Sequence, residues 1–353
     1  MKLTTRACSC ALALVSLLAL ATGAQKDCLP LQATVEVLEE PGAHASGKQH
    51  QGPQDLSRLL GRVVLIKMMH PDRDVIGGLM AMYTKPCETC VHQVDTLNLL
   101  QRKFGPEGLT VLGLTEDPEH AARRFVRAQR VEHAWARDPT GVLSSIVAPN
   151  GGCGAALIDV AGRVVWRGNP QHLRPEVLLP ALTHAFDKPL DDWGPGLHST
   201  RFALRRGELV EALQRAQALP DRRDVVRIRH TVQYLLDARV ALFESADKAG
   251  DRRSQVARGR DLLKALGTDP RRVAIQQRLD ELKQDALCKE ILTAQRDLEE
   301  CRGLRLTRKK ERLRTKEVCV RILRELPNSY AAWEARQLLA RVKRLEDERK
   351  RYE

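Results

Sequence analysis

Aromatic side chains and long apolar runs are both scarce in this sequence. Phe, Trp and Tyr together make up 4% of the 353 residues. No apolar run inside the chain reaches the roughly 20 residues of a membrane-spanning helix, which excludes an internal membrane span. Hydrophobic residues still make up 43% of the chain, which excludes a wholly disordered protein. The length predicts about two domains, each with its own core.

Charge is distributed unevenly along the chain. There are 58 Lys and Arg residues against 45 Asp and Glu residues, a net charge of +13. Residues 1–194 hold 20 basic and 20 acidic residues, whereas residues 195–353 hold 38 basic and 25 acidic residues. The whole surplus therefore lies in the second half, which indicates two modules with different surfaces.

Residues 1–24 have the pattern of a secretory signal peptide. Lys2 and Arg6 precede an apolar run over residues 7–21, and small residues follow up to position 24. An uncleaved membrane anchor is the alternative. A lipoprotein is disfavoured, because Cys28 lies four residues beyond the predicted cleavage point. Export to the periplasm or the cell exterior permits disulfide chemistry in the seven remaining cysteines.

Residues 55–188 alternate apolar strands with amphipathic helices. The pattern predicts strands at 62–69, 79–83 and 109–114, helices at 89–104, 117–130 and 173–186, and a hairpin at 155–167. Strands interleaved with helices in this way predict an α/β layer fold. The preceding residues, 25–54, are predicted to be a flexible tether, because their second half is mostly Gly, Pro, His and Gln.

The remainder of the chain is predicted to be a linker and a helical domain. Residues 189–200 break every periodic pattern, whereas residues 201–353 are rich in Ala, Leu, Arg and Glu at helical spacing. Helix breaks are predicted near Pro220, Gly250, 267–270, Gly303 and Pro327. The last helix pair resembles a tetratricopeptide unit, and an irregular helical bundle is the alternative.

The motif that carries chemistry is Cys87-Glu-Thr-Cys90. It opens a predicted helix, whose N-terminus favours a thiolate at Cys87, and Cys90 one turn later can attack a mixed disulfide. A redox pair is the favoured interpretation. An inert structural disulfide and part of a metal site are the alternatives, although no second CxxC motif completes a four-thiolate zinc site.

Residues 57–187 resemble the thioredoxin-like fold, in particular the exported TlpA/ResA-type thiol–disulfide oxidoreductases and the wider redoxin group. The matching pieces are Leu60-Gly-Arg-Val-Val-Leu-Ile66, the CxxC motif, residues 108–117, and Leu157-Ile-Asp-Val-Ala-Gly-Arg-Val164. The resemblance implies an α/β thioredoxin-like domain in which Cys87 is the nucleophile and Cys90 is the resolving thiol.

The chain departs from the family pattern at several places near the motif. Pro86 stands where family members usually have Trp, and Cys153 stands where they have the cis-Pro that faces the motif. The acidic residue often found in the strand under the motif is missing, with Lys67 or Ala81 in its place. Proton transfer between the thiols then depends on water or on another carboxylate.

This alignment predicts contact between Cys153 and the active pair. Three interpretations of Cys153 are open: a small buried hydrophobe, a third redox thiol, or a ligand that lets the three cysteines hold a soft metal.

Three further cysteines lie in the helical half, at positions 288, 301 and 319. The midpoint of Cys288 and Cys319 falls at the break near Gly303, so an antiparallel helix pair turning there would place the two side by side. A structural disulfide between them is one interpretation, and two separately buried thiols are the other.

Residues 302–316 form a strongly basic run in which Glu311 is the one acid. Its eight basic residues are Arg302, Arg305, Arg308, Lys309, Lys310, Arg312, Arg314 and Lys316. Such a run can bind phosphates electrostatically, but it has no aromatic side chains for stacking on bases. An anionic envelope surface or an acidic protein is therefore a better partner than nucleic acid, and a solvated helix face is the alternative.

The sequence predicts an exported thiol–disulfide oxidoreductase with a helical partner-binding or positioning module. Its expected partners are a protein or small-molecule disulfide and a redox partner, with no cofactor and no bound metal. A non-catalytic adaptor that uses the redoxin-like domain as a scaffold is the alternative. A peroxidase is disfavoured, because the chain has no Pro-x-x-x-Thr-x-x-Cys motif.

Overall fold

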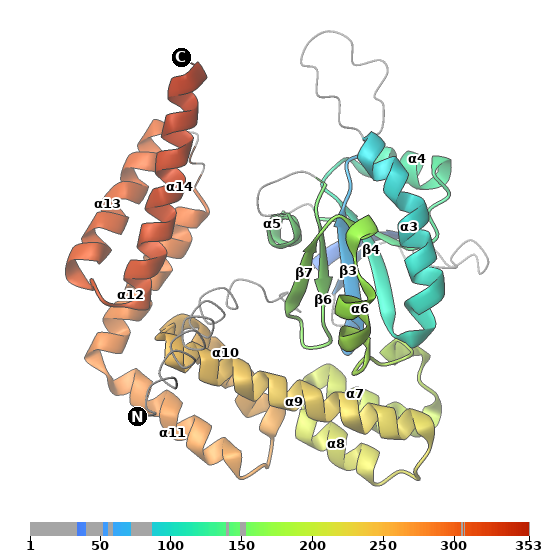
Figure 1. Cartoon of the computed structure of the whole chain (residues 1–353). Helices are drawn as coiled ribbons and strands as arrows, with labels where there is room; N and C mark the ends of the chain where they lie inside the picture. The colour runs from blue at the N-terminus through green and yellow to red at the C-terminus, as the bar shows by residue number, and fades with distance from the viewer. Residues whose placement is uncertain are drawn as a thin grey trace, which may run out of the picture. The chain divides into compact units, whose positions relative to one another are not determined.

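The computed structural model describes residues 34–39, 52–55, 59–71, 87–138, 141–148, 153–304, 306 and 308–352. Along the chain, these residues divide into two compact units between Asp237 and Ala238 (Figure 1). We call the part before this boundary the N-terminal unit and the part after it the helical unit.

A seven-stranded mixed sheet in the order β2-β1-β5-β4-β3-β6-β7 forms the centre of the N-terminal unit (Figure 1). Its strands are β1 (Thr34–Glu39), β2 (Gly52–Asp55), β3 (Val63–Met68), β4 (Leu109–Thr115), β5 (Ala134–Arg137), β6 (Ala155–Ile158) and β7 (Val164–Gly168). The strands β3, β4 and β5 are parallel, and β6 and β7 form an antiparallel hairpin beside β3. This is the predicted thioredoxin-like arrangement, and the strands expected at 62–69, 109–114 and 155–167 are confirmed.

The prediction of a tether over residues 25–54 is wrong for residues 34–39 and 52–55. The strand β1 pairs antiparallel with β2 and with β5. Val35 and Val37 alternate with polar residues, and β-branched side chains at alternate positions suit an extended strand. Pairing also satisfies the backbone groups of β5, which would otherwise form an open sheet edge. The strand predicted at 79–83 lies outside the described residues.

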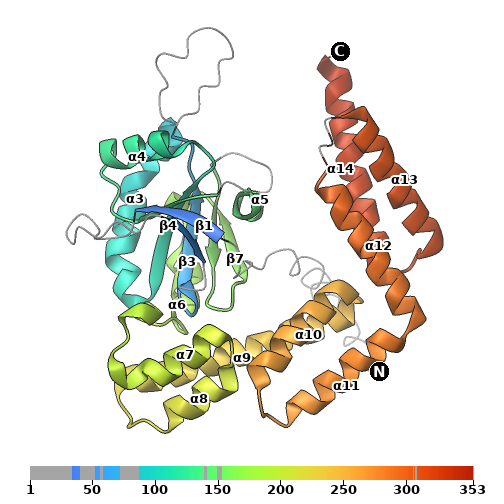
Figure 2. The same ribbon diagram turned by 180° about the vertical axis from the view of Figure 1, so that it is seen from behind.

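Helices pack on both faces of the sheet (Figures 1 and 2). They are α3 (Glu88–Phe104), α4 (Glu119–Ala128), α5 (Val142–Val147) and α6 (Pro175–Leu182), of which α5 was not predicted. Val64, Ile66 and Met68 of β3 pack in a hydrophobic cluster with Leu143 and Val147 of α5. Because side chains alternate along a strand, the intervening residues of β3 point to the opposite face, where α3 packs against β4.

Arg62, a buried arginine at the start of β3, forms hydrogen bonds with several neighbouring segments. The guanidinium group of Arg62 donates hydrogen bonds to four carbonyl oxygens, those of Gly105, Leu109, Phe186 and Asp187. Burial lowers the pKa of Arg62 to about 10, and nearby carboxylates partly oppose the shift. The Arg62 side chain thus links the start of β3 to β4 and to the residues that follow α6. Its N–H donors are all used in hydrogen bonds within the protein.

The segment predicted to be a linker, residues 189–200, is packed instead. Leu190, Trp193 and Leu197 are buried, and the ring of Trp193 meets the ring of Phe186 edge to face with centroids 5.0 Å apart. Two short 3-10 helices, η4 (Leu190–Asp192) and η5 (Pro195–Leu197), shape the segment. Apolar side chains among Gly, Pro and Asp residues therefore attach this stretch to the core.

Helices α7 (His198–Arg206), α8 (Leu209–Gln217) and the first half of α9 (Arg223–Ala249) belong to the N-terminal unit as well. Arg227 of α9 donates to the carbonyl oxygen of Ala185 at 2.7 Å, and the ring of Tyr234 stacks on His184 at 4.2 Å. The boundary between the units thus falls inside α9 rather than in a linker.

The helical unit consists of the second half of α9 followed by five helices. They are α10 (Arg252–Leu266), α11 (Arg271–Gln284), α12 (Ala286–Arg302), α13 (Lys309–Glu325) and α14 (Tyr330–Tyr352). All five predicted helix breaks are confirmed. Two further breaks were not predicted: Gly207 ends α7, and Asp285 caps α12 with its side chain. Ala331 and Ala335 are fully buried against α12 and α13, so small residues allow close packing of the last helix. None of the helices in the described part of the chain is long and apolar enough to cross a membrane.

Candidate redox site

The two cysteines of the motif lie at the start of α3. Cys87 precedes the helix, and its backbone N–H donates to the carbonyl oxygen of His70, just beyond β3, at 3.4 Å. Cys87 is half-buried, whereas Cys90 in the first turn is completely buried. One thiol of the pair is therefore partly open to solvent and the other is enclosed.

Cys153, just before β6, joins the two cysteines of the motif. Its Sγ atom lies 3.4 Å from the Sγ atom of Cys87 and 3.3 Å from that of Cys90. All three sulfur atoms lie within 4.8 Å of one another. Cys153 therefore presents a thiol directly against the CxxC pair. We call Cys87, Cys90 and Cys153 the thiol trio.

Lys67 lies beneath the thiol trio and is completely buried. It sits on β3, on the face that carries α3, and its ammonium group donates a hydrogen bond to the carbonyl oxygen of Cys153. Burial lowers the pKa of Lys67, and attraction to the sulfur atoms of Cys90, Cys153 and Cys87 opposes that shift. Lys67 is one of the two residues, with Ala81, that could occupy the position of the missing acidic residue. No local sequence pattern predicts that this cation is buried and faces all three thiols.

Cys90 and Cys153 have opposite pKa shifts. Donation of its proton to Cys153, together with burial, raises the pKa of Cys90. Acceptance of that hydrogen bond, a second one from Cys87 and the nearby charge of Lys67 lower the pKa of Cys153, although burial acts the other way. Negative charge in the trio is therefore favoured on Cys153 over Cys90.

A polar contact fixes the position of α3 behind the motif. The side-chain amide of Gln93 is buried and donates to Oδ1 of Asn169, just beyond β7, at 2.9 Å. The same oxygen of Asn169 accepts the backbone N–H of Gln171 and so caps the short helix η3 (Pro170–His172). This pair ties the helix that carries Cys90 to the end of the hairpin that follows Cys153.

The predicted disulfide between Cys288 and Cys319 is absent from the structure. Cys288, Cys301 and Cys319 are all buried free thiols. Cys301 and Cys319 share one hydrophobic cluster, whereas Cys288 lies 13 residues before Cys301 on α12, or about 20 Å along the helix axis. A disulfide needs Cα atoms about 4.4–6.8 Å apart, so this arrangement favours two separately buried thiols over the bridge.

The basic run of residues 302–316 is largely neutralised by acidic residues of the helical unit. The pairs are Arg302 with Glu299 and Glu334, Arg308 with Glu311, Arg312 and Lys316 with Glu346, and Arg314 with Glu300. Lys309 and Lys310 are exposed, and Arg305 lies outside the described residues. The run therefore does not form one continuous cationic surface.

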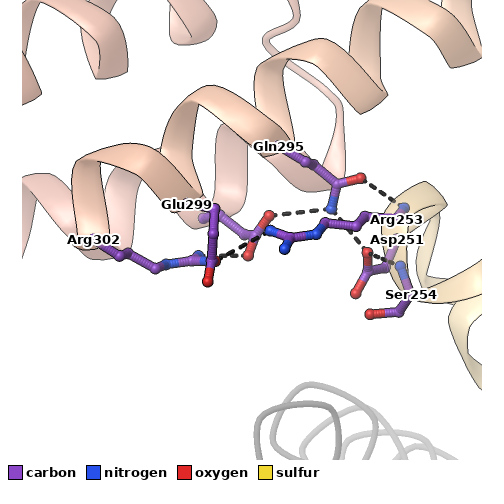
Figure 3. Close-up of polar contacts among 7 residues, drawn as sticks. Asp251, Arg253, Ser254, Gln295, Glu299 and Arg302 are labelled. Atoms are coloured by element: carbon purple, nitrogen blue, oxygen red, sulfur yellow. Dashed lines mark hydrogen bonds and ion pairs between the residues drawn. The ribbon is translucent and has the colours of Figure 1, made fainter. Parts of the chain in front are cut away.

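Arg302 in particular belongs to an internal network (Figure 3). Gln295 donates to Asp251 at 2.8 Å and to Glu334 at 3.2 Å, and Glu334 in turn pairs with Arg302. The backbone N–H of Arg253 donates to the side-chain oxygen of Gln295 at 3.0 Å. This network joins the start of α10 to α12 and α14, which gives Arg302 a structural role.

Solved structures of thiol–disulfide proteins are similar to part of this chain. One is assigned as the thiol:disulfide interchange protein DsbE of Chlorobium tepidum, with 21% identity over 43% of this chain and 95% of the other and a TM-score of 0.31. Another is a secreted Mycobacterium tuberculosis disulfide oxidoreductase homologous to E. coli DsbE, with 15% identity over 43% and 95% of the two chains and a TM-score of 0.30.

Peroxiredoxin Q of Xanthomonas campestris is a further similar structure, with 15% identity over 44% of this chain and 96% of the other and a TM-score of 0.29. No family model matches the chain, and no curated protein matches it. Identities this low relate folds rather than activities.

Proposed function

We propose that this protein is a thiol–disulfide oxidoreductase that exchanges disulfides through Cys87 and Cys90. The observation that supports this most strongly is the arrangement of the sulfur atoms. A half-buried Cys87 stands before a helix N-terminus, and a buried Cys90 lies one turn on, with their sulfur atoms within 4.8 Å. A partly accessible nucleophile beside a protected resolving thiol is the arrangement that exchange through a mixed disulfide requires.

The proposed reaction takes place in two exchange steps. The thiolate of Cys87 attacks one sulfur of the substrate disulfide, which forms a mixed disulfide and releases the other sulfur as a thiolate. Cys90 passes its proton to Cys153, at 3.3 Å, and attacks Sγ of Cys87. The products are the Cys87–Cys90 disulfide and the second substrate thiol, so two electrons pass from the protein to the substrate. The reverse sequence oxidises a dithiol.

An insulin reduction assay with dithiothreitol as the electron donor tests this proposal. We expect turnover by the wild-type chain and loss of turnover in Cys87→Ser, with Cys319→Ser as a matched control because its thiol lies in the helical unit. Cys90→Ser should accumulate the mixed disulfide with its substrate, since the resolving thiol is gone. Equal turnover in wild type and Cys87→Ser would contradict an enzymatic role and favour the scaffold interpretation.

The proposal includes export, which the pattern of residues 1–24 supports. In a host with a secretory system, the secreted fraction should begin just after residue 24 when its N-terminus is sequenced. If the protein were found only in the cell fraction, with residues 1–24 still attached, this part of the proposal would be contradicted.

The helical unit is proposed to bind a partner or to position the redox site. Lys309 and Lys310 at the start of α13 are the exposed part of its basic run. The double variant Lys309→Glu, Lys310→Glu should weaken binding to vesicles of anionic lipid at low salt, because each lost cation removes electrostatic attraction. Equal binding by variant and wild type would assign these two lysines to a solvated helix face.

A further inference from the structure

The thiol trio has the dimensions of a three-coordinate metal site. A metal–thiolate bond is about 2.3 Å long, so three sulfur atoms around one ion in a plane lie about 4.0 Å apart. In the structure, the Sγ atom of Cys153 lies 3.4 Å from that of Cys87 and 3.3 Å from that of Cys90. All three Sγ atoms lie within 4.8 Å of one another. Movements of well under 1 Å at each side chain would therefore admit an ion between them.

The ligand set selects the kind of metal. Among the residues that the structure describes, no His, Asp, Glu or further Cys joins this cluster of three thiols. Structural Zn²⁺ sites almost always have four protein ligands in a tetrahedron, which this trio does not supply. Thiolates are soft ligands that select Cu(I). Cu(I), a monovalent d¹⁰ ion, also accepts three ligands in a plane.

Charge and burial also suit a soft monovalent ion. Three thiolates around Cu(I) carry a net charge of −2, which is costly to bury without a compensating cation. The ammonium group of Lys67 is completely buried and attracts all three sulfur atoms, so it offsets part of that charge. Cys90 is fully buried, which shields the ion from water on one side, while half-buried Cys87 and Cys153 leave a way in.

From these observations, we propose that the reduced thiol trio of Cys87, Cys90 and Cys153 is a binding site for one Cu(I) ion. Binding displaces the remaining thiol protons and involves no change in the oxidation state of copper or sulfur. The inference needs only the reduced trio, so it does not depend on the exchange reaction. It does revise the sequence-based expectation that no metal binds here.

Competition with a coloured chelator measures the site directly. The full chain, reduced and kept free of oxygen, is titrated into the Cu(I) complex of bathocuproine disulfonate, and loss of its absorbance reports transfer of the metal. We expect one Cu(I) per chain, with affinity at least about tenfold lower in Cys153→Ser. Cys288→Ser is the matched control, since it removes a buried thiol from the helical unit, and its affinity should equal that of wild type.

Alkylation mapping keeps the proposal testable if a variant folds poorly. With one equivalent of Cu(I), wild-type Cys87, Cys90 and Cys153 should all resist iodoacetamide, while labelling of the three helical-unit cysteines stays unchanged. Protection of Cys87 and Cys90 alone, or equal affinity in Cys153→Ser and wild type, would overturn the three-thiol site. Stoichiometric copper binding by a chain that lacks insulin reductase activity would overturn the proposed function but leave this inference intact.

Discussion

The buried ammonium group of Lys67 donates a hydrogen bond to the backbone carbonyl oxygen of Cys153. This bond ties the backbone of Cys153 to the strand beneath the CxxC motif. It also places a fixed positive charge next to three sulfur atoms, in a setting where little water screens the attraction. The redox behaviour of the trio should therefore depend on Lys67.

Substitution of Lys67 by Gln should make the trio more reducing. The cation stabilises thiolates, which exist only in the reduced protein, so its removal lowers the reduction potential. We expect a shift of about −30 mV or more, equivalent to about 1.4 kcal/mol for a two-electron couple, in a glutathione redox titration. Gln retains a donor for the Cys153 carbonyl oxygen, and Lys103→Gln, at the exposed far end of α3, is the control. An unchanged potential in Lys67→Gln would show that the cation does not act on the thiols.

Acid should weaken the N-terminal unit through His133. Burial lowers the pKa of His133 to about 3, whereas an unfolded imidazole titrates near 6.5. The unfolded state therefore binds more protons between these two pH values, and stability falls as the pH drops below 6.5. Between pH 6.5 and 5, wild type should lose about 1.6 kcal/mol more than His133→Gln in urea unfolding followed by tryptophan fluorescence. Equal losses of unfolding free energy in wild type and His133→Gln would rule out protonation of His133 as the cause.

Gly113→Ala should destabilise the sheet. A Cβ atom at Gly113 would clash with the ring of Trp135, which is completely buried on the neighbouring strand β5. We expect a loss of about 1–3 kcal/mol in the free energy of unfolding, typical of overpacked cores. Gly194→Ala is the control, because nothing lies within 4 Å of its added Cβ atom and its φ of −63° suits alanine. Equal effects of the two substitutions would contradict the packing of Trp135 over β4.

The helical unit should contain no Cys288–Cys319 crosslink under oxidising conditions. Cys319 shares its cluster with Cys301, at the other end of α12 from Cys288. Digestion of the alkylated, non-reduced protein should yield Cys288 and Cys319 in separate, fully alkylated peptides by mass spectrometry. A linked peptide containing both residues would show that α12 and α13 pair in a different register.

Much of the fold was predictable because it is encoded locally. The apolar runs of β3 and β4 and the turn at residues 160–162 identified the strands next to the site, and helix breaks followed Gly and Pro. The four-residue strand β5 and its neighbours β1 and β2, which end the sheet on that side, are not predicted from the sequence. They are short, and distant segments of the chain supply their pairing partners.

The site was predictable only in part, for the same physical reason. Cys87 and Cys90 are neighbours in sequence, and the resemblance to the family suggested the contact with Cys153. Lys67 is buried beneath the sulfur atoms because β3 packs under α3. No local sequence pattern reveals this packing. Neutralisation of the basic run was also missed, because Glu334 and Glu346 come from α14, well beyond the run in sequence.

Redox titration of the cysteines tests the central claim most directly. The full chain is equilibrated in glutathione buffers of graded potential, quenched by alkylation and mapped by mass spectrometry. We predict a single two-electron transition in which Cys87 and Cys90 pass from free thiols to one disulfide, while Cys288, Cys301 and Cys319 remain alkylated throughout. Free Cys87 and Cys90 thiols across the whole range of potentials would contradict the account.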